Sequence, residues 1–393
     1  MPTAAELRDE FLLDPDVAFL NHGSFGACPR PVFERYQARQ LELEREPVDF
    51  IARRLPTLLA EARAVLGEYL GAAADDLTFV QNATTGVNLA ARSLRLRPGD
   101  EILATELEYG ACDLAWEWLC ARTGAHFVRA GVPLPVARDE DVVTALFARR
   151  TERTRAVFVS HVTSDTALRL PIEAIVARAR VEGLVSIVDG AHGPGQLPLD
   201  LDALGADFYA GNCHKWLCAP KGAGFLHVRP EHQTGVDGAI VGWGYREPAT
   251  FVSRTERQGT RDAAAYLAVP DAIAFQRDRG WDEVQARCRA LALETREELC
   301  ALLGTDPIAA PELLVQMASV RLPQGCDGAG LERRLWVEHR IEVPAMRPEK
   351  DLLRLSVAAY TRREDVERLL AVLPGALRAS RGPRAPRSVE SPA

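Results

Sequence analysis

The sequence predicts an α/β protein in which a mainly parallel sheet is covered by helices, followed by a smaller α+β domain. Two observations predict this architecture. From about residue 77 to residue 228, short apolar runs of strand length alternate with amphipathic stretches of helix length. After about residue 270, a long helical run, short strand-like pieces and a last helix replace that alternation. Parallel sheets bind ligands beyond the carboxyl ends of their strands, so functional residues are expected there.

The individual elements follow from length and apolar patterning. Strands are predicted at residues 77–80, 101–104, 126–128, 156–160, 184–188, 208–210 and 224–227, with helices between them at 87–94, 111–122, 142–150 and 172–182. The second part is predicted to hold a helix over 272–303, strands at 315–322, 340–343 and 352–357, and a helix over 363–373. The tail from residue 380 to residue 393 is rich in Pro, Ser and Arg, and we expect it to be disordered.

Composition limits the class of protein. The chain has 393 residues, of which 47% are hydrophobic and 26% charged, and its net charge of −8 argues against nucleic-acid binding. No apolar run is long enough to cross a bilayer, and the acidic N-terminus lacks a signal pattern, so we expect a cytoplasmic protein without membrane contact. Eight cysteines without a CxxC pair indicate neither a disulfide framework nor a zinc module, and we expect reduced, mostly structural thiols.

Lysine is rare in this chain. Of 47 basic residues only Lys215, Lys221 and Lys350 are lysines, and the rest are arginines. Genomic base composition accounts for such a bias as a whole. It does not account for two of the three lysines lying in one short segment.

Polar residues follow the ends of three predicted strands. After the first strand, residues 82–86 (NATTG) open an amphipathic helix, which indicates either an anion site at the helix N-terminus or a plain N-cap. Asp189 ends another strand and precedes a turn that contains His192, which suits a buried carboxylate paired with a cation, a metal ligand or a capping residue.

The third strand end carries Lys215, within residues 207–226 (DFYAGNCHKWLCAPKGAGFL). A lysine held on a tight loop among apolar residues acquires a lowered pKa and can act as an amine nucleophile. Two ordinary surface lysines would fit poorly beside the flanking Trp and Cys. An anion site, a strand-end Asp and a loop Lys together supply what pyridoxal phosphate needs: a phosphate cradle, a partner for the pyridinium nitrogen and a Schiff-base amine.

With these segments in place, the chain resembles the class V aminotransferase superfamily of fold-type I pyridoxal-phosphate enzymes, and within it the isopenicillin N epimerase-like group. The resemblance runs from about residue 19 to residue 373. It rests on FLNHGSFGACP (19–29), QNATTGVN (81–88), EYGAC (108–112), SHVTSDTALRLP (160–171), VDGAHGPGQ (188–196), YAGNCHKWLCAPKGAGFLH (209–227), GWGY (242–245), GTRD (259–262) and LRLSVAAY (353–360). It implies an N-terminal segment on the substrate side (1–30), a large cofactor-binding domain (31–270) and a small C-terminal domain (271–379).

The resemblance also implies a role for each matching residue. Lys215 carries the Schiff base, Asp189 pairs with the ring nitrogen, and His192 contacts the ring hydroxyl or the ring edge. The remaining cofactor contacts are Thr84, Thr85 and His214 at the phosphate, Tyr109 stacked on the ring, Thr163 near the ring hydroxyl, and Thr260 at the phosphate of a neighbouring subunit in a homodimer. Arg354 grips the substrate carboxylate, while His22 and Tyr245 lie in motifs on the substrate side.

Two positions depart from the family pattern. Asp165 stands where relatives usually have Pro or a small residue, and it is either a substrate-side carboxylate or a loop residue, the second being favoured. Thr361 and Arg362 follow Tyr360 where Asn-Thr is common. Both departures bear on the identity of the amino-acid-type substrate and leave the cofactor assignment intact.

Several reactions start with removal of the substrate α-proton by Lys215. Epimerisation is favoured by the overall resemblance, and it requires a second acid, for which Tyr245, His22 and Asp165 are candidates. Elimination from a cysteine conjugate by a C–S lyase is the alternative, and transamination comes third. A desulfurase is disfavoured because no cysteine lies between Glu338 and Arg354. A non-catalytic binding protein ranks last, since such proteins usually lose the Lys or the Asp.

Overall fold

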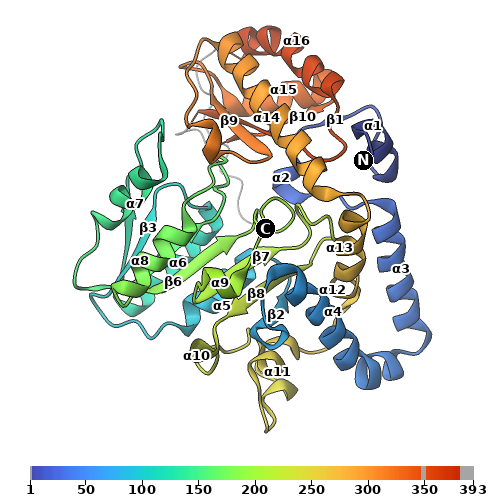
Figure 1. Ribbon diagram of the computed structural model, residues 1–393, viewed down its shortest axis with the longest axis vertical. Coiled ribbons are helices and arrows are strands. Elements are labelled where there is room, and N and C mark those ends of the chain that lie inside the picture. Colours follow the sequence, from blue (N-terminus) through green and yellow to red (C-terminus); the bar gives the residue numbers. More distant parts are fainter. Residues whose placement is uncertain (1, 347–350, 381–393) are drawn as a thin grey trace.

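The computed structural model describes residues 2–346 and 351–380 of the chain. The tail predicted to be disordered lies outside the described residues, except for Ser380. Figure 1 shows a broad sheet with its helices, and above it a second group formed by the C-terminal elements.

A seven-stranded sheet forms the centre of the larger part. Its strands lie in the order β2 (Leu77–Val80), β8 (Gly224–Val228), β7 (Phe208–Asn212), β6 (Val185–Gly190), β5 (Thr154–Ser160), β3 (Glu101–Thr105) and β4 (His126–Ala130). Only β8 runs antiparallel to its neighbours among these strands. The predicted α/β class with a mainly parallel sheet is therefore confirmed.

Both faces of this sheet are buried, as the near-continuous apolar runs predicted. Along β5, Val157 and Val159 join one apolar cluster, while Ala156 and Phe158 join a second cluster on the opposite face. The first cluster takes in residues of α4 (Leu55–Leu70), α7 (Asp139–Phe147) and α8 (Ile172–Val181), and the second takes in residues of α5 (Ala83–Ser93) and α6 (Gly110–Thr123). Because helices cover both faces of the sheet, the ends of its strands are the part left open to a ligand.

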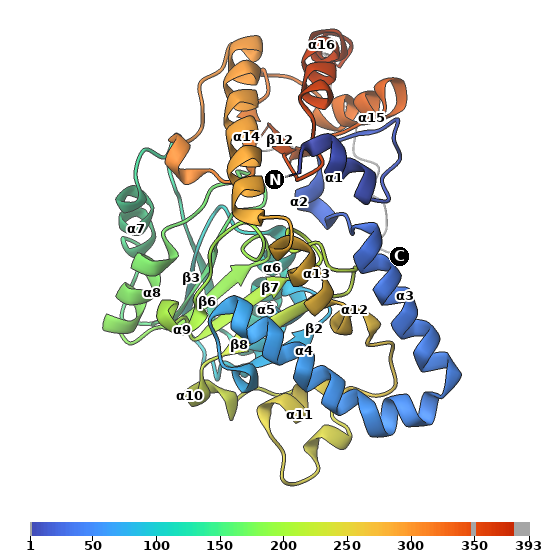
Figure 2. The same cartoon turned by 45° about the vertical axis from the view of Figure 1, so that its right-hand side comes forward.

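The C-terminal part contains a small antiparallel sheet in the order β11 (Ala345–Met346), β12 (Leu352–Ser356) and β9 (Met317–Arg321). Three helices accompany it: α14 (Trp281–Leu303), α15 (Gly328–His339) and α16 (Arg363–Ala379). Near the N-terminus, β1 (Ala18–Phe19) pairs in parallel with β10 (Ile341–Glu342). In Figure 2, α1 and α2 accordingly lie beside the C-terminal elements.

Two predicted helices have different limits. The run predicted as one helix over 272–303 is divided into α13 (Val269–Arg277) and α14, because Gly280 adopts a left-handed φ of 61° between them. The last helix does not end at residue 373 but continues through Pro374 to Ala379, since Ala376 and Leu377 are buried and hold it against the core. The domain boundary predicted after residue 270 falls in the first turn of α13, and it stays a prediction.

The remaining elements are short or peripheral. They are α1 (Ala4–Glu10), α2 (His22–Phe25), α3 (Arg30–Arg45), the helical turns Asp49–Arg54, Ala74–Asp76, Trp243–Tyr245 and Pro311–Leu313, α9 (Leu201–Leu204), α10 (Pro230–Gln233), α11 (Phe251–Glu256) and α12 (Ala264–Leu267). Within the described ranges, no helix has the length and apolar character needed to cross a membrane.

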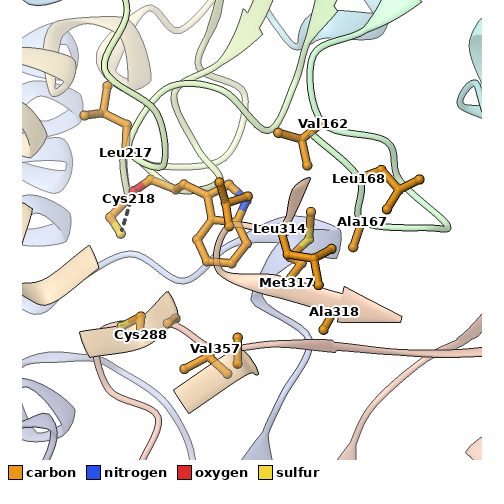
Figure 3. Close-up of a cluster of buried hydrophobic side chains, with 14 of the residues drawn as sticks. Val162, Ala167, Leu168, Leu217, Cys218, Cys288, Leu314, Met317, Ala318 and Val357 are labelled. Atoms are coloured by element: carbon orange, nitrogen blue, oxygen red, sulfur yellow. Dashed lines mark hydrogen bonds between the residues drawn. The ribbon is translucent and has the colours of Figure 1, made fainter. Parts of the chain in front are cut away.

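A buried apolar cluster joins the two parts of the molecule. Figure 3 shows Leu217 and Cys218, from the loop after β7, in the same apolar cluster as Met317 and Ala318 of β9 and Val357 beyond β12. This loop also carries Lys215, so apolar packing against the C-terminal part restrains the backbone on which the lysine stands.

Candidate active site

A cleft opens at the carboxyl ends of the central strands, where ligands were expected. Ser160 ends β5, Asp189 lies at the end of β6, and Asn212 ends β7. The cleft has an internal volume of about 170 Å³. Its lining consists of Ser24, Phe25, Asn82, Ala83, Thr84, Tyr109, Ser160, Val162, Ser164, Asp189, Ala191, His192, Asn212, His214 and Lys215. Six of the predicted site residues are therefore brought together in one place.

Asp189 is a buried carboxylate at the floor of the cleft, with 3% of its surface exposed. One oxygen, Oδ1, accepts a hydrogen bond from the Ala191 amide at 2.9 Å, and Cys112 Sγ lies 3.4 Å from the other oxygen. Burial raises the pKa of Asp189, while the amide bond and the charge of Lys215 oppose this shift. A positively charged ligand nitrogen beside Asp189 would stabilise the ionised carboxylate and so oppose the rise in its pKa that burial causes.

The predicted anion site lies at the N-terminus of α5. Asn82 caps the helix, its Oδ1 accepting from the Thr85 amide at 2.9 Å, and Asn212 Oδ1 accepts from the Ala83 amide at 2.7 Å. The Thr85 hydroxyl also bonds to Asn82, at 3.1 Å. Thr84, between these two anchored amides, lines the cleft. The geometry thus offers Thr84 and the positive end of the helix dipole to an anion.

Lys215 stands on the loop between β7 and β8. Its Nζ lies 3.2 Å from Nε2 of His192. Burial is the main cause that lowers the pKa of Lys215 to about 8, and the charge of Arg354 acts in the same direction, whereas Asp189 opposes it. Roughly a tenth of this amine is therefore uncharged at pH 7, far more than for an ordinary lysine, and only the uncharged form can act as a nucleophile or a base.

His214 precedes the lysine and lines the same cleft. Its Nδ1 lies 2.9 Å from the Ala223 carbonyl oxygen, which can only accept, so Nδ1 carries a proton. Burial lowers the pKa of His214 to about 4. Its Nε2 therefore has a proton to donate only when the ring is charged, which a bound phosphate would favour.

His22 lies behind the lysine loop and does not line the cleft of its own chain. Its Nε2 bonds to the Lys215 carbonyl at 3.0 Å and its Nδ1 to the Tyr360 hydroxyl at 2.9 Å, while burial lowers the pKa of His22 to about 3. Gly26 in the same segment has a φ of 70°, and a Cβ there would come within 2.1 Å of the His214 carbonyl oxygen. The N-terminal segment thus packs directly against the lysine loop.

Arg354 occupies the middle of β12 and is 1% exposed. Its guanidinium donates to the Ser164 carbonyl at 2.8 Å and to the Ser24 hydroxyl at 2.9 Å. Since Ser24 and Ser164 line the cleft, the cation lies one side chain behind the lining. Burial lowers the pKa of Arg354 to about 10, and the nearby Asp165 opposes this. Asp165 is itself buried and lies outside the cleft lining.

Three further predicted residues lie away from the cleft of their own chain. The Thr163 hydroxyl is 2.7 Å from that of Thr166 and accepts from the Leu168 amide at 2.8 Å, so it shapes its own loop. The Tyr245 hydroxyl donates to Asp237 at 3.1 Å. Thr260 lines a separate groove together with Trp243. The role of Thr260 in a neighbouring subunit stays a prediction.

Sequence reasoning missed several residues around the cleft. Glu108 is fully buried, and its Oε2 accepts from the Ser160 amide at 2.7 Å and the Ser160 hydroxyl at 2.6 Å. Burial raises the pKa of Glu108 to about 7. The indole nitrogen of Trp216 lies 3.1 Å from His192 Nδ1. Asn212 could have been found as a polar strand end, but no local pattern signals the contacts of Glu108 or Trp216.

The described side chains fit pyridoxal phosphate. The α5 N-terminus with Thr84 matches a phosphate, the buried Asp189 matches a protonated ring nitrogen, and Lys215 matches the aldehyde. All three lie in the lining of one cleft, and Tyr109 and His192 complete its sides.

Comparisons with known proteins agree with this geometry. Residues 35–369 match the family model "Aminotransferase class-V". The chain is 42% identical to an isopenicillin N epimerase of Amycolatopsis lactamdurans, covering 94% of this chain and 97% of the relative. It is 30% identical to a probable chloroplastic L-cysteine desulfhydrase of Arabidopsis thaliana, covering 96% and 86%. A solved structure of the cystine C–S lyase C-DES has a similar fold, with a TM-score of 0.81 and 24% identity over 94% of this chain and 99% of that one. The chain belongs to the class V aminotransferase family.

Proposed function

We propose that this protein is an amino-acid epimerase that removes the α-proton of an amino-acid-type substrate and returns a proton to the opposite face. Its cofactor is pyridoxal phosphate. The observation that carries the proposal is the convergence of Lys215, Asp189 and the α5 N-terminus in one cleft. The choice of epimerisation is supported by the 42% identity to an isopenicillin N epimerase over most of both chains.

The position of each residue in or near the cleft suggests its role in the proposed reaction. Pyridoxal phosphate, when bound, supplies an electron sink for the charge left at the α-carbon. Thr84, the first turn of α5 and His214 would hold its phosphate, and Asp189 would hold its ring nitrogen in the protonated state. Lys215, whose pKa is lowered to about 8, can accept the α-proton at Nζ near neutral pH. Arg354 lies close behind Ser24 and Ser164, where it would attract a substrate carboxylate.

Epimerisation needs a second proton donor across the cleft from Lys215. His22 has both ring nitrogens engaged behind the lysine loop, and neither Tyr245 nor Asp165 lines the cleft of its own chain. Tyr109 does line the cleft, and 43% of its surface is exposed. We therefore assign the second proton transfer to the Tyr109 hydroxyl.

The assembly and location follow from weaker observations. Tyr245 and Thr260 lie outside the cleft of their own chain, which suits a homodimer in which each subunit completes the other's site. All eight cysteines fall within the described residues and form no disulfide, which suits a reducing cytoplasm. No nucleic-acid partner is proposed, given the net charge of −8.

A C–S lyase acting on a cysteine conjugate is the second candidate, favoured by the 30% identity to a probable L-cysteine desulfhydrase. A desulfurase is not favoured, because no cysteine is among the described residues that line the cleft. Burial also raises the pKa of Cys28, a cysteine of the N-terminal segment, to about 12. Transamination ranks third, and a non-catalytic role ranks last because Lys215 and Asp189 are both present.

The deciding experiment follows α-proton exchange in deuterated water with protein carrying pyridoxal phosphate. L- and D-amino acids and cysteine conjugates form the substrate panel, and NMR with chiral chromatography identifies the products. Deuterium incorporation with both enantiomers appearing supports the epimerase. Release of ammonia, a free thiol and an α-keto acid identifies the lyase instead. Exchange with none of the panel would contradict a free amino acid as substrate.

A further inference from the structure

A chain of three side chains leads from the protein core to the amine of Lys215. The Trp216 indole nitrogen lies 3.1 Å from Nδ1 of His192, and Nε2 of His192 lies 3.2 Å from Nζ of Lys215. Trp216 is 2% exposed and His192 is 3% exposed, so both contacts are shielded from water. Each ring nitrogen of His192 therefore has one defined partner.

The direction of these hydrogen bonds follows from the chemistry of the donors. An indole N–H can only donate, so Nδ1 of His192 must accept and cannot carry a proton. A neutral imidazole then carries its proton on Nε2, which faces Lys215. An Nε2–H can only donate to Nζ, and Nζ accepts only when the amine is uncharged, because an ammonium group has no lone pair.

We propose that Trp216 is a positioning residue that fixes His192 as the Nε2–H tautomer and so favours the free amine of Lys215 over its ammonium form. The catalytic value of this arrangement rests on the proposed function of Lys215. The opposite arrangement is costly, because a charged Lys215 would place a donor against the Nε2–H donor. Moving the imidazole proton to Nδ1 would place it against the indole N–H.

The surroundings of Trp216 hold its indole in place. The Gln276 amide donates to the Trp216 carbonyl at 2.7 Å, and the ring of His22 packs against the indole with centroids 4.7 Å apart. At Gly195, which has a φ of 84°, a Cβ would lie 2.2 Å from the Trp216 carbonyl oxygen. This backbone approach and the buried packing leave the indole little freedom to turn away from His192.

Other charged groups around Lys215 act in both directions. Arg354 disfavours the charged amine, whereas Asp189 and Cys112 favour it. His192 faces Lys215, Arg354 and His22, each of which disfavours its charged form. The effects of these neighbouring charges on the pKa of Lys215 thus partly cancel. The hydrogen-bond direction imposed through Trp216 is a separate contribution that a single substitution can remove.

The scarcity of lysine makes the amine directly observable. Protein labelled with 13C at lysine Cε gives only three signals, and the Lys215→Ala variant assigns one of them. We expect the Lys215 signal of the full chain without pyridoxal phosphate to titrate near pH 8. Trp216→Phe keeps an apolar ring but removes the donor, and the midpoint should rise by about one unit. The matched control is Trp116→Phe, a fully buried indole in the apolar cluster on the other face of the sheet, which should leave the midpoint unchanged.

Measuring the tautomer of His192 is a second test, and it uses the unsubstituted protein. In protein labelled with 15N at its eight histidines, Nδ1 of His192 should give a pyridine-type signal and Nε2 a pyrrole-type signal. A protonated Nδ1 in the unsubstituted protein would overturn the proposal, and so would an unchanged Lys215 midpoint in folded Trp216→Phe. Neither measurement uses the cofactor. A failure of the proposed function, seen as no visible absorbance when pyridoxal phosphate is added, is therefore distinguishable from a failure of this inference.

Discussion

At the scale of single residues, burial decides the chemistry of the site. Lys215, His192 and Arg354 all have a pKa below the ordinary value of their side chain, and desolvation is the largest cause in each case. A cation that is costly to bury becomes a neutral base or seeks an anion. Under the proposed function, the cleft would attract an anionic substrate and keep its amine reactive.

The reactivity of Lys215 should follow its lowered pKa. Only the neutral amine attacks an aldehyde, so the rate at which the cofactor-free protein captures pyridoxal phosphate should rise with pH and level off above about 8. Stopped-flow absorbance measures this rate. Lys215→Ala should show no lysine-bound chromophore at any pH, and a midpoint near the ordinary lysine value of about 10.4 would contradict the assignment.

Tyr109→Phe should separate the two proton transfers. Because Lys215 still removes the α-proton, exchange with deuterated water should continue on the starting enantiomer. The opposite enantiomer should form at least about 100-fold more slowly, as expected when a general acid is lost. Chiral chromatography coupled to mass spectrometry measures both rates. Unchanged epimer formation would remove Tyr109 from the reaction.

Arg354→Ala should raise KM for carboxylate substrates by roughly 10–100-fold, because it removes charge-assisted hydrogen bonds that contribute about 1.5–3 kcal/mol. Steady-state kinetics with a substrate and its carboxamide analogue provide the comparison. Arg296→Ala is the matched control, since Arg296 is 3% exposed and bonds to the Ala309 carbonyl outside the cleft. If both variants shift KM equally, the carboxylate assignment is wrong.

At the scale of elements, helix α5 suits the proposed phosphate site because its first turn is anchored from outside the helix. Asn82 and Asn212 hold two amides in fixed directions, and this leaves Thr84 at the cleft. Strand β6 supplies Asp189, and the loop after β7 supplies Lys215. Adjacent parallel strands thus bring together groups that are distant in sequence.

Asn82→Ala should weaken both the helix and the site. Loss of the N-cap costs about 1 kcal/mol of unfolding free energy, and the loosened first turn should raise the dissociation constant for pyridoxal phosphate. Denaturant titration and equilibrium dialysis measure the two effects. Asp327→Ala removes the N-cap of α15, which lies in the C-terminal part, and it should lower stability alone. Equal cofactor affinity in both variants would contradict the anion site.

Strand ends were the part of the site that sequence could predict. Asp189 and Lys215 follow apolar runs that fold as β6 and β7, so their convergence follows from strand order. The partners of these residues could not be predicted in the same way. Glu108 meets Ser160, and His22 meets Lys215 across 193 positions, through packing that leaves no local periodicity. Likewise, the apolar pattern before Gly280 does not indicate that the stretch predicted as one helix consists of two helices.

At the scale of the whole molecule, the two parts are joined through the lysine loop. The apolar cluster of Figure 3 connects Leu217 and Cys218 with β9 and with Val357. A separate groove beside α11, lined by Trp243 and Thr260, stands apart from this junction. The apolar cluster lies within one chain, and the groove holds Thr260, the residue on which the predicted homodimer contact rests.

The predicted homodimer makes a mixing experiment informative. Thr260→Ala and Lys215→Ala should each be nearly inactive alone, because every site would lack one contribution. After unfolding and refolding together, mixed dimers should regain up to about a quarter of normal activity, since one site per mixed dimer is complete. Sedimentation checks the assembly. A monomer, or no regain in a confirmed mixed dimer, would contradict shared sites.

The position of His22 has a consequence for how the protein matures. This side chain connects the Lys215 carbonyl to Tyr360, so three distant stretches of the chain meet at one imidazole. During synthesis the central sheet leaves the ribosome well before Tyr360 does. The reactive amine consequently obtains its final surroundings only after Tyr360 has been synthesised. We therefore expect cofactor capture to follow synthesis of the C-terminal part rather than to accompany folding of the central sheet.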